Sequence, residues 1–340
     1  MMADSVRLAS GLTISRNEEV LPFPHAASED MLCTFRARVE SALSRHGAPG
    51  EWEFFDMDAI SSAQRAYLVE RGVMTPGFAK GVGRSRAFGL FQGGRAALEI
   101  NGTDHLRMLG SGPPDGLSDV WATLDHIDDT LESEIAYAFD ERWGYLTARA
   151  ADSGTGLRAF LTLHAPGLMI TGRLAAVAAS LAGEGLALAP LWSGAGGVFQ
   201  VFNRKALGTS EGRITEAVTA ATRDIVEQER TVRKGLLREN PVSVRDHIGR
   251  ALGVAQQAWS VSVAEALTLV SSIQVGVSMD LVEGPGIDAG ATLSLMRRVQ
   301  SAHVVVDGMG SGLGGLEDPR VDEVRAQLLR RIFAGARVAQ

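Results

Sequence analysis

Apolar residues recur at three- and four-residue steps over 117–139, and this spacing predicts a long amphipathic helix. The opposite side of that segment carries a row of acidic residues. Such a row is typical of a solvated helix face rather than a metal site. The same spacing predicts three further helices, over 27–46, 61–71 and 210–237.

Short apolar runs bounded by glycines or turn residues predict strands between these helices. Long helices mixed with short strands in irregular order indicate an α+β fold, because regular βαβ repeats would alternate the two. The predicted strands cover 88–92, 96–101, 144–148, 185–189 and 197–202.

The part of the chain after Asn240 differs, because only helical spacing recurs there. Pro241 interrupts a charged helix end, and proline ends or kinks a helix. We therefore place a boundary near 238–242, with one domain over 1–238 and a helical domain over 239–340. The helices expected in the second domain cover 244–252, 263–281, 289–300 and 321–334.

The composition is that of an ordinary globular protein, with 45% hydrophobic and 21% charged residues among 340. A formal net charge of −7 argues against a nucleic-acid binder, because neutralising phosphates needs clustered lysine and arginine. The single cysteine, Cys33, can form no intrachain disulfide, which indicates a reducing compartment. No segment reaches the roughly 20 apolar residues of a membrane helix and no signal peptide is recognisable, so we expect a cytoplasmic protein.

A dinucleotide-binding fingerprint is present by letter at 303–315, where His-Val-Val-Val-Asp precedes three spaced glycines. That fingerprint requires a strand before the glycines and a helix after them. Pro319 follows almost at once, so a glycine-rich loop is the preferred interpretation. The seven histidines show no spacing suited to a metal, and no metal site is expected.

Four stretches combine glycine turns, arginines and apolar runs in an order that extends over 8–235. They read LASGLTISRNEEVLPFP, INGTDHLRM, FDERWGYLTARAADSGTGLRAFLTLHAP and GGVFQVFNRKALG, the last followed by IVEQER. Gly-Tyr-Leu-Thr and Gly-Thr-Gly-Leu-Arg in the third stretch are the most specific part. Together the stretches resemble the ATP:guanido phosphotransferase (phosphagen kinase) family.

This resemblance implies a guanido kinase catalytic fold, an antiparallel sheet flanked by helices in a glutamine-synthetase-like arrangement, followed by a helical C-terminal domain. The helical tail, and the lack of a separate small N-terminal helical domain, resemble the bacterial protein arginine kinases. In that branch an Arg-Asp-x-x-Arg-Ala motif binds phosphoarginine. Asp322 and Arg325 match the motif and are the phosphoarginine-binding candidates, whereas Val321 replaces its first arginine.

The reaction of this family makes clear demands on charge. A guanidinium has a pKa above about 12, so a nearby carboxylate must orient it and accept its proton before a nitrogen attacks phosphorus. The transferred phosphoryl group needs Mg²⁺ and fixed arginines around its oxygens. By resemblance, a glutamate pair, a cysteine and a set of arginines supply these groups.

Several of these positions hold other residues in this chain. The glutamate pair falls on Gly102 and Thr103, and neither side chain can accept a proton from a guanidinium. The cysteine falls on Arg149, a cation that would repel a cationic substrate. In a gapless alignment, the two arginines of the first stretch fall on Gly11 and Thr13. We therefore expect no family catalytic residue here and almost no arginine phosphorylation.

Other positions of the pattern are retained. Arg107 and Arg158 keep two phosphate positions, and Arg16 also matches. Segment 189–195, where a further arginine and glutamate are expected, has neither, and Phe160 replaces a small residue and is expected to intrude on the nucleotide pocket. The candidates for nucleotide or phosphate binding are Arg16, Arg107, Arg158 and His164.

Three interpretations follow. The preferred one is a degenerate pseudokinase that acts as a regulatory or binding protein, with Mg-ATP or ADP bound weakly or not at all. Its expected partners are a second copy or an active paralogue, forming a dimer, and phosphoarginine-bearing proteins, but neither nucleic acid nor membrane. The second is an active phosphotransferase with a different acceptor, in which Asp104, Asp152 or Glu99 supplies the carboxylate and Arg149 contacts phosphate. The third is a structural oligomerisation module with an empty pocket.

Overall fold

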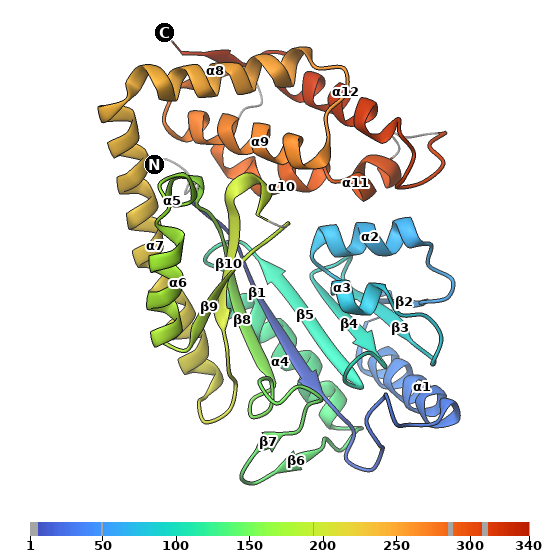
Figure 1. The fold of residues 1–340 in the computed structure, drawn as a ribbon. Helices are drawn as coiled ribbons and strands as arrows, with labels where there is room; N and C mark the ends of the chain where they lie inside the picture. The colour runs from blue at the N-terminus through green and yellow to red at the C-terminus, as the bar shows by residue number, and fades with distance from the viewer. Residues whose placement is uncertain (1–5, 49, 193, 285–287, 308–311, 340) are drawn as a thin grey trace. The chain divides into compact units, whose positions relative to one another are not determined.

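The computed structural model describes residues 6–48, 50–192, 194–284, 288–307 and 312–339. The chain forms two compact units. We call Ala9–Phe160 with Phe202–Thr219 the sheet unit, and Met1–Leu8, Leu161–Val201 and Ala220–Gln340 the helical unit. Four elements contribute residues to both units (Figure 1): β1 (Arg7–Arg16), β8 (Leu157–His164), β10 (Val198–Asn203) and α7 (Glu211–Glu239).

An antiparallel sheet forms the centre of the sheet unit. Its strands follow the order β2-β3-β4-β5-β1-β8-β10, and each pair from β2 to β1 is antiparallel. The register pairs Ser15 of β1 with Arg107 of β5, and Glu99 of β4 with the same Arg107. The four strands not yet given are β2 (Trp52–Asp56), β3 (Ala87–Phe91), β4 (Ala96–Ile100) and β5 (Leu106–Gly112).

Alternation along β1 and β5 divides the side chains between two faces of this sheet. One face packs on α1 (Glu29–His46) and α4 (Leu117–Glu132); a Cβ at Gly110 would touch Val120 and Leu124 of α4. The opposite face carries Gly11, Thr13 and Arg107. A buried cluster covers part of it, in which side chains from α2 (Ser62–Arg71) and α3 (Pro76–Ala79) meet the strands: Met57, Ile60, Val73, Met74, Phe78, Phe88, Leu90, Ala97 and Leu109.

Capping residues explain where the helices of the sheet unit begin. The Ser28 hydroxyl accepts the Met31 N–H at the start of α1. Ser61 and Gln64 form a reciprocal capping box at the start of α2, and Gly72 ends that helix in the left-handed conformation. The structure ends α4 at Glu132 rather than near 139, although the next apolar residue of the pattern, Ile135, is still buried.

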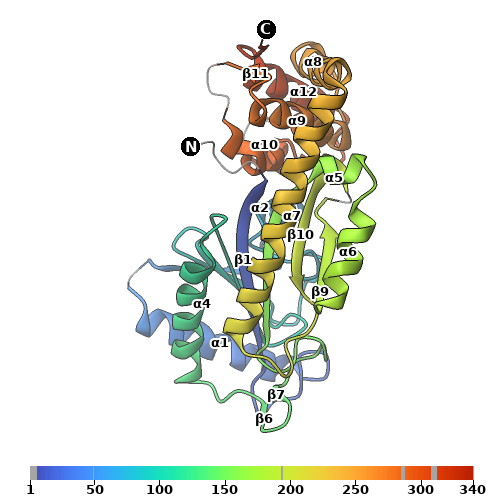
Figure 2. The ribbon, with the colours of Figure 1, turned by 90° about the vertical axis from the view of Figure 1, so that its left-hand side faces the viewer.

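The helical unit contains further strands and most of the helices. Its strands follow the order β1-β8-β10-β9, where β9 is Leu186–Pro190, and α6 (Leu174–Gly183) packs beside β9 (Figure 2). The long helix α7 ends at Glu239, and Pro241 is the first residue of the next helix. The other helices are α5 (Pro166–Ile170), α8 (Pro241–Gln257), α9 (Val263–Ser278), α10 (Thr292–Arg298), α11 (Ser301–Val306) and α12 (Val321–Phe333).

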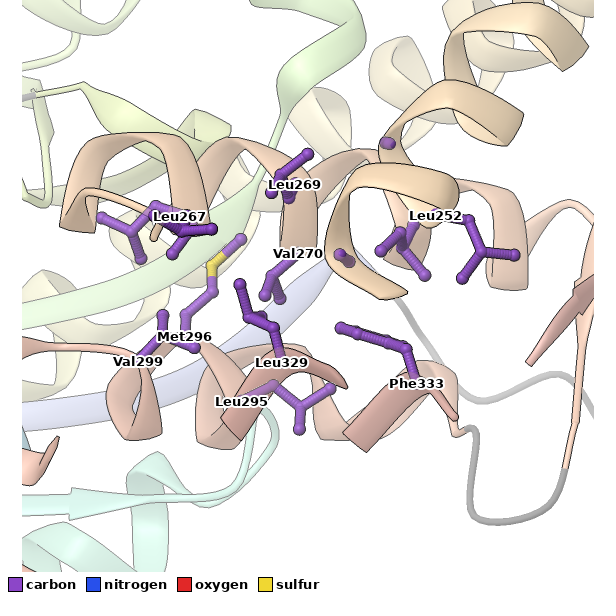
Figure 3. Packing of buried hydrophobic residues seen from close by; sticks show 14 of the residues in the cluster. Leu252, Leu267, Leu269, Val270, Leu295, Met296, Val299, Leu329 and Phe333 are labelled. Atoms are coloured by element: carbon purple, nitrogen blue, oxygen red, sulfur yellow. The ribbon is translucent and has the colours of Figure 1, made fainter. Parts of the chain in front are cut away.

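Helices α8, α9, α10 and α12 enclose the main core of the helical unit (Figure 3). The fully buried Phe333 of α12 belongs to this cluster, whose members come from these four helices and from neighbouring strands and loops. Short β11 (Val282–Glu283) and β12 (Arg337–Val338) pair beside it. The labelled core residues of Figure 3 are Leu252, Leu267, Leu269, Val270, Leu295, Met296, Val299, Leu329 and Phe333.

The α+β prediction is confirmed, but several elements differ from expectation. Strands β1, β5 and β8 were absent from the predicted set, although they form the middle of the sheet. His303 lies in helix α11 rather than in a strand, which rules out the dinucleotide fingerprint there. Residues 308–311 of the glycine-rich loop and Ser193 of segment 189–195 lie outside the described residues. The predicted helix break at Pro241 is present, whereas the domain boundary itself stays a prediction. Among the described residues, no helix is long and apolar enough to cross a membrane.

Candidate functional site

The loop that joins β4 to β5 carries Gly102 and Thr103, where the sequence resemblance predicts a glutamate pair. Asn101 starts this loop in the left-handed conformation, at φ 58°, which asparagine tolerates better than most residues. Its amide nitrogen donates to the carbonyl oxygens of Leu32 and Ser85, at 3.0 and 2.9 Å. The loop is therefore tied to α1 and to the turn before β3, and it presents Gly102 and Thr103 in a fixed place.

Gly102 and Thr103 line a cavity of about 290 Å³ within the sheet unit. Charged side chains dominate the wall of this cavity, with three arginines facing two carboxylic acids. A cavity of this kind suits a small polar ligand with anionic groups better than an apolar one. Its lining residues are Thr75, Gly77, Phe78, Arg86, Glu99, Gly102, Thr103, Asp104, Arg107 and Arg149.

Three arginines converge on the carboxylate of Asp152 beside this cavity. Arg158 donates from Nη2 to Oδ1 at 2.9 Å. Arg107 Nη2 and Arg149 Nε lie 3.8 and 3.6 Å from Oδ2. Two of the predicted phosphate residues, Arg107 and Arg158, are thus brought together, and Arg149 joins them.

Asp104 is held entirely by internal donors. Its Oδ1 accepts hydrogen bonds from the Asn17 amide and the Ala148 N–H, at 2.8 and 2.7 Å. Its Oδ2 accepts from Arg107 at 3.5 Å. A fully buried carboxylate with these partners anchors the loop 101–105 to its neighbours, and its oxygens are already occupied as hydrogen-bond acceptors.

Glu99 is the other carboxylic acid of the cavity, and it is buried on β4 beside Arg107. It accepts hydrogen bonds from both the backbone N–H and the hydroxyl of Thr75, the residue that caps α3. Burial raises the pKa of Glu99 to about 7, against the opposing effects of the Thr75 hydrogen bonds and of the Arg107 and Arg86 charges. Glu99 can therefore change its charge near neutral pH.

Glu99 makes the stability of the folded chain depend on pH. Its pKa rises from 4.5 to about 7 on folding, so its contribution is fully present below pH 4.5 and is lost as the pH rises through 7. Glu99→Gln should remove at most about 3 kcal/mol of this loss between about pH 5 and 8. Urea unfolding of both proteins at each pH measures the difference. The exposed Glu53→Gln should follow the wild-type curve, and a pH-independent gap for Glu99→Gln would contradict the assignment.

Gly11 and Phe160 face each other on β1 and β8, on the same face as Arg107. A Cβ atom at Gly11 would lie 2.2 Å from Cζ and 2.6 Å from Cε2 of the Phe160 ring. Real Cβ atoms do not approach other atoms so closely, so the ring occupies the space where any side chain at position 11 would begin. Phe160 was expected to intrude on the nucleotide pocket, and its ring lies against Gly11.

Arg16 points to the other face of the sheet, away from the three-arginine cluster. Its Nη2 pairs with Asp128 of α4 at 2.6 Å, and its Nη1 donates to the Thr155 carbonyl at 2.9 Å. The guanidinium carbon lies 3.6 Å from the ring centroid of Tyr145. Arg16 is 4% exposed, and these contacts hold the Gly154–Gly156 turn and α4 against β1.

Gly156 shows why the Gly-Thr-Gly part of the third stretch is needed. It adopts φ 71°, a left-handed conformation that favours glycine. A Cβ there would lie 2.5 Å from Arg16 Nη1 and 2.6 Å from the Ser15 carbonyl oxygen. The close approach of this turn to β1 therefore depends on glycine.

Two family models match the chain. Residues 34–232 match the ATP:guanido phosphotransferase C-terminal catalytic domain, and residues 241–340 match the protein-arginine kinase McsB C-terminal domain. The chain belongs to the ATP:guanido phosphotransferase family. A protein-arginine kinase of Moorella thermoacetica is 33% identical over 339 residues, covering 96% of this chain and 94% of that protein. One of Halothermothrix orenii is 31% identical over 301 residues, covering 87% of this chain and 85% of that protein. These relatives place the chain in the protein-arginine kinase branch.

A solved structure supports the fold. The crystal structure of lombricine kinase superimposes with a TM-score of 0.58 over 69% of each chain, at 15% sequence identity. At this identity the likeness shows the fold alone. The guanido kinase fold predicted from the four stretches is thereby confirmed.

His164, the remaining nucleotide-binding candidate of this family member, is fully buried in the helical unit. Its Nε2 lies 2.8 Å from the Ser271 hydroxyl, and its carbonyl oxygen accepts from Arg233 at 2.9 Å. Neither Arg107 nor Arg158 belongs to this unit. The structure therefore places His164 in a buried polar network rather than in the cavity with the arginines.

The two phosphoarginine-binding candidates also lie in the helical unit. Arg325 is 1% exposed, and it donates to the carbonyl oxygens of Val299 and Val261 at 2.7 and 2.8 Å. It also donates to the Ser301 hydroxyl at 2.9 Å and pairs with Asp322. These contacts connect α12 to the segments before α9 and α11, so the guanidinium is engaged with its own chain. The phosphoarginine prediction stays a prediction.

Sequence reasoning missed one residue of the cavity and one buried ion pair of the helical unit. One is Thr75, which holds Glu99 from an adjacent helix and has no sequence signal. The other is the buried pair of Glu229 and Arg233 in α7, whose four-residue spacing is a signal for a helical ion pair. Among the described residues, no group of three or more histidine, cysteine, aspartate or glutamate side chains is placed to hold a metal ion.

Proposed function

We propose that this protein is a catalytically degenerate protein-arginine kinase homologue that acts by binding rather than by phosphoryl transfer. The observation that carries this proposal is the Phe160 ring seated over Gly11, because it fills the space of an arginine that the family uses on the transferred phosphate. One arginine on a transferring phosphoryl group is worth about 10³ to 10⁵ in rate. Thr13 removes a second such charge.

The carboxylates around the cavity support the same proposal. Gly102 and Thr103 stand where a glutamate pair would orient the guanidinium. Asp104 is fully engaged with internal donors, and Asp152 is surrounded by arginines. A protein arginine entering the cavity would meet Arg149 and Arg107 as like charges, and no carboxylate at the family positions would receive its proton.

The residues present fit a phosphate group only in part. Arg107 and Arg158 suit phosphate oxygens, whereas Gly11, Thr13 and Phe160 do not fit the family's nucleotide clamp. We therefore propose that Mg-ATP or ADP binds weakly or not at all. The proposed partners are a second copy of the chain, an active paralogue or phosphoarginine-bearing proteins, all met in the cytoplasm.

The purified protein should form no phosphoarginine on an acceptor protein with Mg-ATP. We expect a rate at least about 10³-fold below that of the Moorella thermoacetica protein-arginine kinase in the same assay, because losses of charge stabilisation and of the base combine. Phosphorus NMR distinguishes phosphoarginine from phosphate esters. A rate within about 10-fold of that relative would overturn the proposal.

A second candidate function is an active phosphotransferase with a rebuilt site. It is favoured by Glu99, whose pKa of about 7 and place beside Arg107 suit a general base near neutral pH. The same assay separates the two functions: ATP turnover with an acceptor other than arginine, lost in Arg158→Ala and Glu99→Gln, would favour the second. A thermal-shift series with Mg-ATP, ADP and phosphoarginine separates both from a purely structural module, because only a ligand that prefers the native state raises Tm.

A further inference from the structure

The Asp152 carboxylate occupies the centre of the arginine cluster in the sheet unit. Its side chain is 9% exposed, so its charge is balanced by the neighbouring cations more than by water. Arg158 makes a direct hydrogen bond to it, whereas Arg107 and Arg149 lie at 3.8 and 3.6 Å, beyond hydrogen-bond distance. One carboxylate thus draws three guanidinium groups together without saturating them.

The charges of this cluster do not cancel. Arg107, Arg149 and Arg158 bring three positive charges, and Asp152 with Asp104 brings two negative ones. Each guanidinium offers five N–H donors in a planar fork. The two oxygens of one carboxylate cannot accept hydrogen bonds from all the donors of three such groups. With the Asp152 carboxylate displaced, two positive charges are left in excess, and a doubly charged tetrahedral oxyanion with three or four acceptor oxygens would match both this charge and the donors.

Arg149 and Asp152 lie in the same turn between β7 (Gly144–Tyr145) and β8. The Asp152 N–H donates to the Arg149 carbonyl oxygen at 2.8 Å, which ties the two residues into one short loop. Arg107 and Arg158, by contrast, project from strands. A change in the side-chain rotamer of Asp152 would move its carboxylate away while Arg149 and the two strand arginines stay in place.

We propose that Arg149 joins Arg107 and Arg158 in a single oxyanion site, and that the Asp152 carboxylate is a built-in competitor that a phosphate-bearing ligand must displace. The inference rests on the proposed function, since a protein that acts by binding needs an anion site but no proton acceptor. The proposal explains why position 149 holds an arginine, although a cation there would repel an arginine substrate. It also accounts for a carboxylate in contact with arginines suited to phosphate.

Asp152→Asn tests the proposal, because asparagine keeps the shape and the oxygen that accepts from Arg158 but removes the competing charge. Calorimetric titrations at constant ionic strength would use inorganic phosphate and, separately, ADP. We expect Asp152→Asn to raise the affinity for inorganic phosphate by about 10-fold. Adding Arg149→Met to that variant should return the affinity to within about threefold of the wild type. A gain with ADP but not with phosphate would assign the site to nucleotides.

Asp119→Asn is the matched control, because it makes the same change of charge on the exposed face of α4. If Asp152→Asn raises the affinity for phosphate no more than Asp119→Asn does, the proposal that the Asp152 carboxylate competes with phosphate is wrong. If adding Arg149→Met to the Asp152→Asn variant leaves the affinity for phosphate unchanged, Arg149 is not part of the oxyanion site. If Asp152 were only a structural partner, its substitution would lower Tm without raising the affinity for phosphate. Asp152→Ser is a second variant for the same titration if Asp152→Asn fails to fold. Phosphoarginine formation by the wild type would overturn the proposed function and leave these titrations standing.

Discussion

Glu229→Ala is expected to lower the free energy of unfolding by about 3–5 kcal/mol, because it removes one partner of a buried ion pair. Glu229 is fully buried and accepts from Arg233 Nε at 2.7 Å, while Arg233 itself is 6% exposed. Its two oxygens also accept the N–H groups of Gly167 and Leu168 at the start of α5, at 2.9 and 2.8 Å. Alanine would leave a buried guanidinium and two backbone donors without this acceptor.

Glu227→Ala is the matched control, two residues away on the same helix. Glu227 pairs with Arg230, and their side chains are 70% and 43% exposed. Removing an exposed pair costs less than about 1 kcal/mol. Urea unfolding followed by circular dichroism measures both variants. Losses that agree within about 1 kcal/mol would show that the Glu229 pair does not hold α5 and α7 together as argued.

Gly11→Arg and Phe160→Ser are expected to be strongly non-additive. Gly11→Arg alone should destabilise by about 2–3 kcal/mol, because its Cβ would enter the Phe160 ring. In the Phe160→Ser background most of this cost should vanish, since the ring is gone. A smaller strain remains, because the same Cβ would lie 2.9 Å from the Gly110 carbonyl oxygen. A double-mutant cycle gives the coupling energy.

The double variant should also bind ADP about 10- to 100-fold more tightly than the wild type. The reason is that a charge-assisted hydrogen bond to phosphate is worth about 1.5–3 kcal/mol once the space is open. Titration calorimetry at constant ionic strength measures it. Gly212→Arg adds the same charge at a place where a new Cβ would meet no other part of the chain within 4 Å, and it should leave ADP affinity unchanged. Equal gains in both proteins would mean that net charge, not the rebuilt position 11, changes binding.

Local signals predicted most of the long helices because their causes are local, whereas α6 was not predicted. In α2, for example, the capping box of Ser61 and Gln64 and the left-handed Gly72 set the two ends of the helix from within its own sequence. Strands β1, β5 and β8 were missed because they are central and buried on both faces, so they show little alternation of apolar and polar residues. Their pairing joins residues about a hundred positions apart, as between Ser15 and Arg107, and no local spacing encodes it.

The sequence by itself determined the family and the α+β fold, and it predicted that the family's charged residues are replaced at 11, 13, 102 and 103 and its cysteine at 149. These follow from residue identity and order, which need no coordinates. Only the tertiary structure decided which arginines share one carboxylate, because Arg107, Arg149 and Arg158 come from two strands and a turn that meet only in the folded sheet. It also separated Arg16 from them, because alternation along β1 turns that side chain to the opposite face, where it pairs with Asp128.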